Sequence, residues 1–278
     1  MDIGRHEVLL HELKFPPRPE VVLVLAEESA KEQPNLARIG KLVKADVALA
    51  GAMLKAINSP IWRRSRKITS ITQAIDLLGL NNVKSIATGL VLRTSVGAPN
   101  GQNMERFWDS AEKVALIGAL IARGQSGITP DEAYTYGLFH DCGIPMLLHR
   151  FPGYRAALVK ANQTEETTFT ETEEQGVGTH HAVVGYFLAR SWGLSEPVAN
   201  AILQHHDVDI LGSAEVAEST LDFIALGHLA QHIVHLMSRD SRDIEWERFG
   251  PATMKRFGLS EDDFLDLQEE AQAVQLAA

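Results

Sequence analysis

The sequence predicts an all-α protein built from many helices, and three observations lead to this fold class. Apolar residues recur at intervals of three and four in most long segments, which places them on one face of a helix. Residues that favour helix starts, such as Ser70 and the pair Thr129-Pro130, stand at the beginning of several such segments. No segment alternates apolar and polar residues convincingly with the period of two that indicates a β-strand.

Three helices are expected in the first half. Residues 43–57 place apolar side chains on one face, and Pro60 ends this helix because the residue before a proline is pushed out of the α region. Residues 70–79 form a second helix, opened by a serine–glutamine capping box and closed by a glycine. A third begins over residues 83–90, and the glycine- and proline-rich residues 97–101 predict a loop between two halves.

The second half carries further helical segments. The expected helices lie at about residues 114–124, 129–143, 184–193, 195–206, 221–235 and 260–274. Thr129 opens the best-marked helix, because a cap residue, a first-turn proline and a capping-box glutamate occur together. Residues 162–172 are rich in Thr and Glu and poor in apolar residues, so they predict an exposed connection. The two halves are expected to fold as one unit because the loop between them is short.

Composition excludes several classes of function. The 278 residues are 45% hydrophobic and 22% charged, as in ordinary globular proteins. A net charge of -10 repels phosphate backbones, so no nucleic-acid partner is expected, and the basic stretch 61–67 is interpreted as a solvated loop. The single cysteine, Cys142, fits a reducing compartment. Met1–Lys14 lacks the apolar core of a signal peptide, and no apolar run approaches the roughly 20 residues that span a bilayer, so a cytoplasmic protein without membrane contact is expected.

The first candidate for chemistry is the dipeptide His140-Asp141, which follows an apolar helix. An ionised aspartate in such a place is costly unless it is paired or bound to a metal. Both residues can ligate an ion, and a hydrogen-bonded pair in the core is the alternative for the dipeptide alone. His228, His232 and His235 share one side of a helix with no acidic residue beside them in the sequence, so they predict a partly exposed polar face.

Longer segments resemble the HDOD family, relatives of the HD-domain and HD-GYP metal-dependent phosphohydrolases. Tyr136–Gly143 resembles the HD signature, His181–Gly185 the following His-x-x-x-Gly segment, and Gln204–Asp207 the later double histidine, in matching order and spacing. Four N-terminal segments resemble HDOD proteins specifically: Phe15–Val21, Asp46–Ala50, Ala56–Pro60 and Ile68–Leu80. The resemblance implies a single multi-helix HDOD module over residues 1–278, with an N-terminal helical part (about 10–100), an HD-like part (about 103–240) and a C-terminal helical extension (about 241–278).

The resemblance also implies a metal site with two lost ligand positions. Ser110 stands where the family has its first histidine, and Gln231 where catalytic relatives have an aspartate. Ile144 replaces a lysine that can serve a phosphate in many relatives. The ligand residues that remain are His140, Asp141, His181, His205 and His206. This set suits one divalent transition metal such as iron, zinc or manganese, and a hydrogen-bonded relic without metal is the alternative.

Three functions follow from this pattern. The resemblance implies a bacterial signal-transduction module without catalysis, which binds a signalling protein or a small nucleotide-like ligand. The second function is metal-dependent hydrolysis of phosphodiesters or nucleotides, in which a metal-activated water attacks the phosphoester. The third is a scaffold with no ligand. Positions 110 and 231 separate the first two, because a neutral hydroxyl and a neutral amide are poor replacements for an imidazole and a carboxylate.

Overall fold

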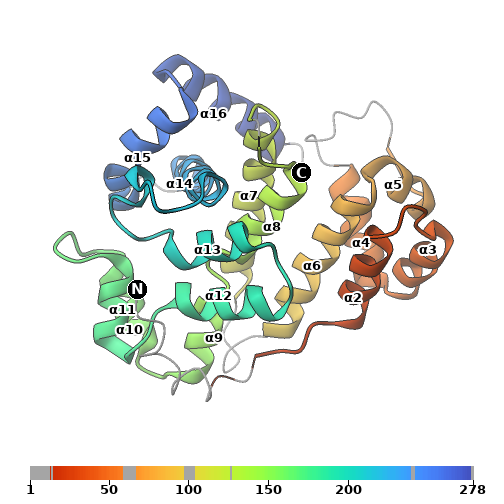
Figure 1. The fold of residues 1–278 in the computed structure, drawn as a ribbon, viewed down its shortest axis with the longest axis horizontal. Helices are drawn as coiled ribbons and strands as arrows, with labels where there is room; N and C mark the ends of the chain where they lie inside the picture. Colours follow the sequence, from red (N-terminus) through yellow and green to blue (C-terminus); the bar gives the residue numbers. More distant parts are fainter. Residues whose placement is uncertain are drawn as a thin grey trace.

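All regular elements of the described chain are helices. The computed structural model describes residue 13 and residues 15–58, 67–96, 104–125, 127–238 and 242–276. Within these ranges no strand occurs, which confirms the all-α prediction (Figure 1). The expected loop at 97–101 and residues 61–66 of the basic stretch lie outside the described residues. None of the described helices combines the length and hydropathy needed to cross a bilayer.

An N-terminal group of helices builds its own core. Its members are α2 (Glu20–Ser29), α3 (Leu36–Ala45), α4 (Val47–Ile57), α5 (Ile71–Leu78) and α6 (Leu80–Val96). A buried apolar cluster that runs from Leu25 to Ala87 lies between them. In Figure 1 this group stands to one side, in red to yellow.

A C-terminal group carries the larger core. Its members are α7 (Glu105–Ala122), α8 (Pro130–Phe139), α9 (Gly143–Arg150), α10 (Tyr154–Ala161), α11 (Phe169–Val177), α12 (His181–Ser191), α13 (Glu196–Gln204), the 3-10 turn η4 (Ile210–Gly212), α14 (Glu218–Ser238), α15 (Ile244–Phe257) and α16 (Glu261–Leu276). Helix α14 packs against α7, α8, α13, α15 and α16. Figure 1 shows α14 almost end-on, with these neighbours around it.

The two groups meet directly where α6 packs against α8. The hydroxyl of Ser85 on α6 donates to the backbone oxygen of Asp131 (3.0 Å) and accepts from the hydroxyl of Thr135 (2.9 Å). Tyr134 on α8 packs against the apolar clusters of both groups. These contacts are consistent with one folding unit, which stays a prediction.

The predicted helix over residues 43–57 is wrong, because the structure divides it at Asp46. Helix α3 ends at Ala45, and the Asp46 carboxylate caps α4 by accepting from the backbone N–H groups of Ala48 and Leu49 (2.9 and 3.0 Å). Val47, expected on the buried face, is 85% exposed. The buried stripe of α4 consists of Leu49, Met53 and Ile57. Spacing alone could not reveal this break, since the apolar rhythm continues across it.

Helix starts were predicted with mixed success. Ser70 caps α5 as expected, by accepting from the backbone N–H of Gln73. Thr129 precedes α8, but its hydroxyl donates to the Glu132 carboxylate (2.8 Å) and caps no backbone N–H. The segment 162–172 is only partly an exposed connection, because a capping box at Thr168 starts α11 there and buries the next residue, Phe169.

Candidate metal centre

The candidate ligands stand at the ends of four helices that meet in the C-terminal group. His140 follows α8 and Asp141 lies in the turn before α9, while His181 is the first residue of α12. His205 and His206 directly follow α13. His140, Asp141, His181 and one of His205 and His206 were expected to converge, and the structure brings both of the last two to the cluster.

Two glycines permit this convergence. A Cβ atom on Gly137 would lie 2.5 Å from the Cα of Ala115, so α8 and α7 touch through their backbones just before His140. A Cβ atom on Gly143 would lie 2.1 Å from the backbone oxygen of His181. Because this space is filled by backbone, only glycine at 143 lets the start of α12 reach Asp141.

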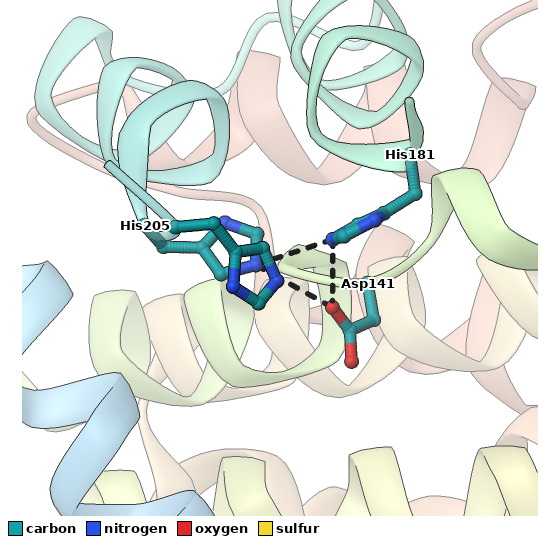
Figure 2. Close-up of side chains that lie close together, drawn as sticks. Asp141, His181 and His205 are labelled. Atoms are coloured by element: carbon teal, nitrogen blue, oxygen red, sulfur yellow. Dashed lines mark hydrogen bonds and ion pairs between the residues drawn. The ribbon is translucent and has the colours of Figure 1, made fainter. Parts of the chain in front are cut away.

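The Asp141 carboxylate is the centre of the cluster. Its Oδ1 lies 3.3 Å from Nε2 of His181 and 3.5 Å from Nε2 of His205, and its Oδ2 lies 3.1 Å from Nε2 of His140. One potential ligand atom from each of Asp141, His181, His205 and His206 lies within 4.8 Å of the others. Figure 2 shows the rings of His181 and His205 pointing toward Asp141. The distances leave room for one shared ion.

Backbone carbonyls orient two of the imidazoles. Nδ1 of His140 lies 2.7 Å from the carbonyl oxygen of Gly137, and Nδ1 of His205 lies 2.8 Å from that of Ile202. A carbonyl oxygen only accepts hydrogen bonds, so each Nδ1 carries the hydrogen. In the neutral ring, Nε2 then holds the lone pair that a metal needs.

Carboxylates orient the other two imidazoles. Nδ1 of His181 lies 2.7 Å from Oε2 of Glu173, and Nδ1 of His206 lies 2.7 Å from Oε2 of Glu245. A carboxylate behind a metal-binding histidine fixes the ring and makes it a better ligand. All four imidazoles therefore turn Nε2 inward with Nδ1 held from behind, an arrangement that fits a metal ion.

Glu173 was missed by the sequence analysis. It lies on α11, is fully buried, and also accepts from the backbone N–H of His181 and from the hydroxyl of Tyr154. The signal that could have found it is the capping box at Thr168, which predicts a helix that carries Glu173 toward the core. Glu245 was missed because nothing in the sequence links it to His206.

At Asp141 and His181 the neighbouring charges oppose the effect of burial. Burial alone would lower the pKa of His181, but the carboxylates of Glu173 and Asp141 raise it to about 10. Burial would raise the pKa of Asp141, and His140 and its neighbours hold it well below the usual range. Burial, followed by the neighbouring imidazoles, lowers the pKa of His206. Asp141 is therefore an anion that requires a positive charge, supplied by a proton on His181 or by a divalent cation.

The two altered ligand positions behave differently. Gln231 on α14 reaches the cluster, and its amide nitrogen lies 3.0 Å from Nε2 of His140, to which it donates. Ser110 lies on α7 and is exposed, and within the described residues no hydrogen bond joins it to the cluster. Nε2 of His140 is therefore contacted by both Gln231 and the Asp141 carboxylate, which leaves it less accessible to an ion.

The histidines of α14 form the expected partly exposed face only at His232 and His235, which are half-buried. His228 is buried, donates from Nε2 to the carbonyl oxygen of His205 (2.7 Å) and stacks on Phe249, and burial lowers its pKa to about 3. An acidic residue does lie beside the others, since Asp243 accepts from Nδ1 of His232 (2.9 Å). The sequence could not show this, because Asp243 precedes the next helix. His228 thus supports His205 from behind.

A comparison with known families identifies the fold. The sequence profile of the HDOD domain matches residues 15–208, more than half of the chain. The chain belongs to the HDOD domain family. All four helix ends that build the cluster, and His205 and His206 after the last of them, lie within the matched residues. Cys142, beside Asp141, is a buried free thiol, and burial raises its pKa.

Solved structures share this fold over nearly the whole chain. An HDOD domain protein of unknown function from Geobacter sulfurreducens is 23% identical, with a TM-score of 0.73 over 99% of this chain and 94% of that one. A proposed phosphohydrolase from Shewanella amazonensis is 19% identical, with a TM-score of 0.73 over 99% and 95% of the two chains. At these identities the similarity shows the HDOD fold alone.

Relatives in sequence are longer proteins. An uncharacterised protein of Treponema pallidum is 26% identical over 202 residues, which cover 70% of this chain and 38% of the relative. The uncharacterised protein YuxH of Bacillus subtilis is 35% identical over 130 residues, which cover 45% of this chain and 30% of YuxH. The matched part is thus about a third of the length of each relative.

Proposed function

We propose that this HDOD protein is a regulatory signal-transduction module that holds one divalent transition metal, iron, zinc or manganese, and binds a signalling protein or a small nucleotide-like ligand. The metal ligands are Asp141, His181, His205 and His206, with His140 beside them. The observation that carries the proposal is the contact between the Gln231 amide and His140. A neutral amide at this place leaves ligands for one ion, whereas a second ion would need a carboxylate there.

The donor set supports one ion. Three inward-facing imidazole nitrogens and a carboxylate oxygen match the ligands that iron, zinc and manganese accept. The rings of His181 and His206 are fixed by Glu173 and Glu245, so these two ligands are already oriented before an ion binds. A divalent cation would replace the proton on His181 as the charge opposite Asp141.

The same geometry argues against a second ion. Gln231 brings a neutral amide where a carboxylate would add a negative charge, and that amide donates to His140. Ser110 offers a neutral hydroxyl instead of an imidazole, and its side chain is exposed on α7. A two-metal hydrolase clamps both the attacking and the leaving oxygen, so losing one ion removes half of that clamp. These losses favour regulation over turnover.

The test combines metal analysis with an assay of hydrolysis. The full chain, purified without chelator, is expected to contain about one transition-metal ion, and Asp141→Ala is expected to lose it. Bis(p-nitrophenyl) phosphate with added Mn²⁺ or Fe²⁺ is expected to show no turnover above background. Turnover that disappears in Asp141→Ala would contradict the regulatory assignment and support a phosphohydrolase. A metal-free wild type would support a scaffold instead.

One observation favours hydrolysis as the second candidate. The Asp141 side chain is 23% exposed, whereas His181 and His205 are almost completely buried, so the centre opens toward solvent on the Asp141 side. A phosphoester could approach an ion from that side, and a metal-bound water could attack it. The hydrolysis assay separates this candidate from the first.

Ligand binding needs its own measurement. The family resemblance supports a nucleotide-like molecule, so cyclic dinucleotides and mononucleotides are the probes. A ligand that binds the folded state raises the thermal midpoint with its concentration. A midpoint unchanged at millimolar nucleotide would leave a protein partner as the remaining form of the proposal, to be tested by affinity capture and analytical ultracentrifugation with the captured protein.

A further inference from the structure

Helix α15 lies outside the segment matched by the family, yet its first turn forms part of the metal centre. The family match ends at residue 208, and α15 covers Ile244–Phe257. Oε2 of Glu245 accepts from Nδ1 of His206 at 2.7 Å, and the Glu245 side chain is 27% exposed. His206 therefore owes its ring orientation to a helix that follows it by about forty residues.

The same turn of α15 also holds the segment that leads into α11. Nη2 of Arg248 donates to the backbone oxygens of Glu165 and Thr167, both at 3.0 Å. Nη1 of Arg248 lies 3.5 Å from Oε1 of Glu245. Because α11 carries Glu173, which orients His181, the start of α15 contacts the supports of two candidate ligands.

Aromatic stacking fixes α15 against α14. The rings of His232 and Trp246 are parallel with centroids 4.2 Å apart, and those of His228 and Phe249 are nearly parallel at 3.9 Å. His228 in turn donates to the backbone of His205. Movement of α15 would therefore displace the contacts that hold both His205 and His206.

We propose that Glu245 is a positioning residue for His206, and that metal occupancy and the docking of α15 are coupled through this contact. The inference rests on the proposed function, since it requires a metal at the centre. Without the carboxylate, the buried Nδ1–H of His206 loses its acceptor and the ring is free to turn its other nitrogen inward. Coupling between two sites is reciprocal, so a bound ion must also stabilise the docked position of α15.

The first experiment measures Zn²⁺ affinity of the full chain by competition with a chromophoric chelator. Glu245→Ala is expected to bind Zn²⁺ about 10- to 100-fold more weakly than the wild type, as found when the partner of a metal-binding histidine is removed. Glu245→Gln keeps an acceptor oxygen and is expected to lose less. Glu247→Gln is the control, because Glu247 lies on the same helix and pairs with exposed Arg242 instead of a histidine.

The second experiment measures hydrogen exchange of α15. Zn²⁺ is expected to slow exchange of its amides in the wild type and in Glu247→Gln, and to have a smaller effect in Glu245→Ala. Circular dichroism checks that each variant is folded. Equal Zn²⁺ affinity in wild type and both Glu245 variants would overturn the positioning role, and unchanged α15 exchange in the wild type would overturn the coupling. A wild type that binds no Zn²⁺ or other transition metal would overturn the proposed function and this inference with it.

Discussion

Gly143 is the position at which a single methyl group should disable the centre. A Cβ atom there would lie 2.1 Å from the backbone oxygen of His181 and 2.9 Å from its carbonyl carbon. Non-bonded carbon atoms prefer separations of about 3.5–4.0 Å, so in Gly143→Ala the starts of α9 and α12 must move apart by roughly 1 Å. Both contacting groups belong to the backbone, so no side-chain rotation can relieve the clash.

The displacement has two measurable effects. Overpacking of this kind destabilises a protein by about 1–3 kcal/mol, which urea denaturation would detect as a lower free energy of unfolding. Metal sites tolerate errors of about 0.2 Å in ligand distance, so a shift of roughly 1 Å in His181 should also prevent the proposed metal binding. Gly153 is the matched control, because a Cβ there meets no atom within 4 Å.

The expected results are therefore opposite for the two glycines. Gly153→Ala should keep both stability and metal content. A Gly143→Ala variant with wild-type stability and wild-type metal content would refute the argument, since it would show that the close approach of the two helices is not required.

Three further predictions concern the polar network. Glu173→Gln should lower the free energy of unfolding by about 1.5–3 kcal/mol and weaken Zn²⁺ binding, because a buried charged acceptor is lost. Glu174→Gln, on the exposed side of α11, should change neither quantity. Equal losses of stability and Zn²⁺ affinity in both variants would contradict the role of Glu173 in orienting His181. His228 has its pKa lowered from 6.5 to about 3, so its contribution to stability is present above pH 6.5 and is lost as the pH falls toward 3. Between pH 6.5 and 5 the free energy of unfolding of His228→Asn should therefore vary less steeply than that of the wild type, by up to about 1.4 kcal/mol per pH unit, and equal slopes would exclude a buried neutral imidazole. The double substitution Ser110→His and Gln231→Asp should raise metal affinity in chelator competition, because it adds one imidazole and one negative charge; unchanged affinity in a folded protein would show that these positions do not face the ion.

The helices were predictable where two kinds of signal agreed. The helix at Ser70 has both a cap residue and an apolar face, and it forms as expected. At Asp46 the apolar spacing continues across a helix break, so the prediction followed the spacing and missed the cap residue in the sequence. Around Thr168 the prediction followed the polar composition and missed the capping box that starts α11. Composition describes a whole segment, whereas a cap acts at one residue, and here the cap determined the structure.

The candidate ligands were predictable because their chemistry is unusual in an apolar setting. His140-Asp141 and the double histidine are recognisable because polar, metal-binding residues follow apolar helical segments there. Glu173 and Glu245 do not, because glutamate on a helix is ordinarily solvated. Their importance depends on packing between α11, α12 and α15, which brings carboxylates behind imidazoles that are distant in the sequence. The candidate ligands were visible from the sequence, and the residues that orient them were not.

The boundary of the family match is not a physical boundary of this protein. A fragment cut after residue 208 would lack α14, whose apolar residues from Phe223 to Val234 fill the larger core, and it would leave that core open to water. It would also lose Gln231 and Glu245, and with them the contacts to two histidines. Expression designs and domain transplants should therefore carry the chain at least through Phe257, the last residue of α15.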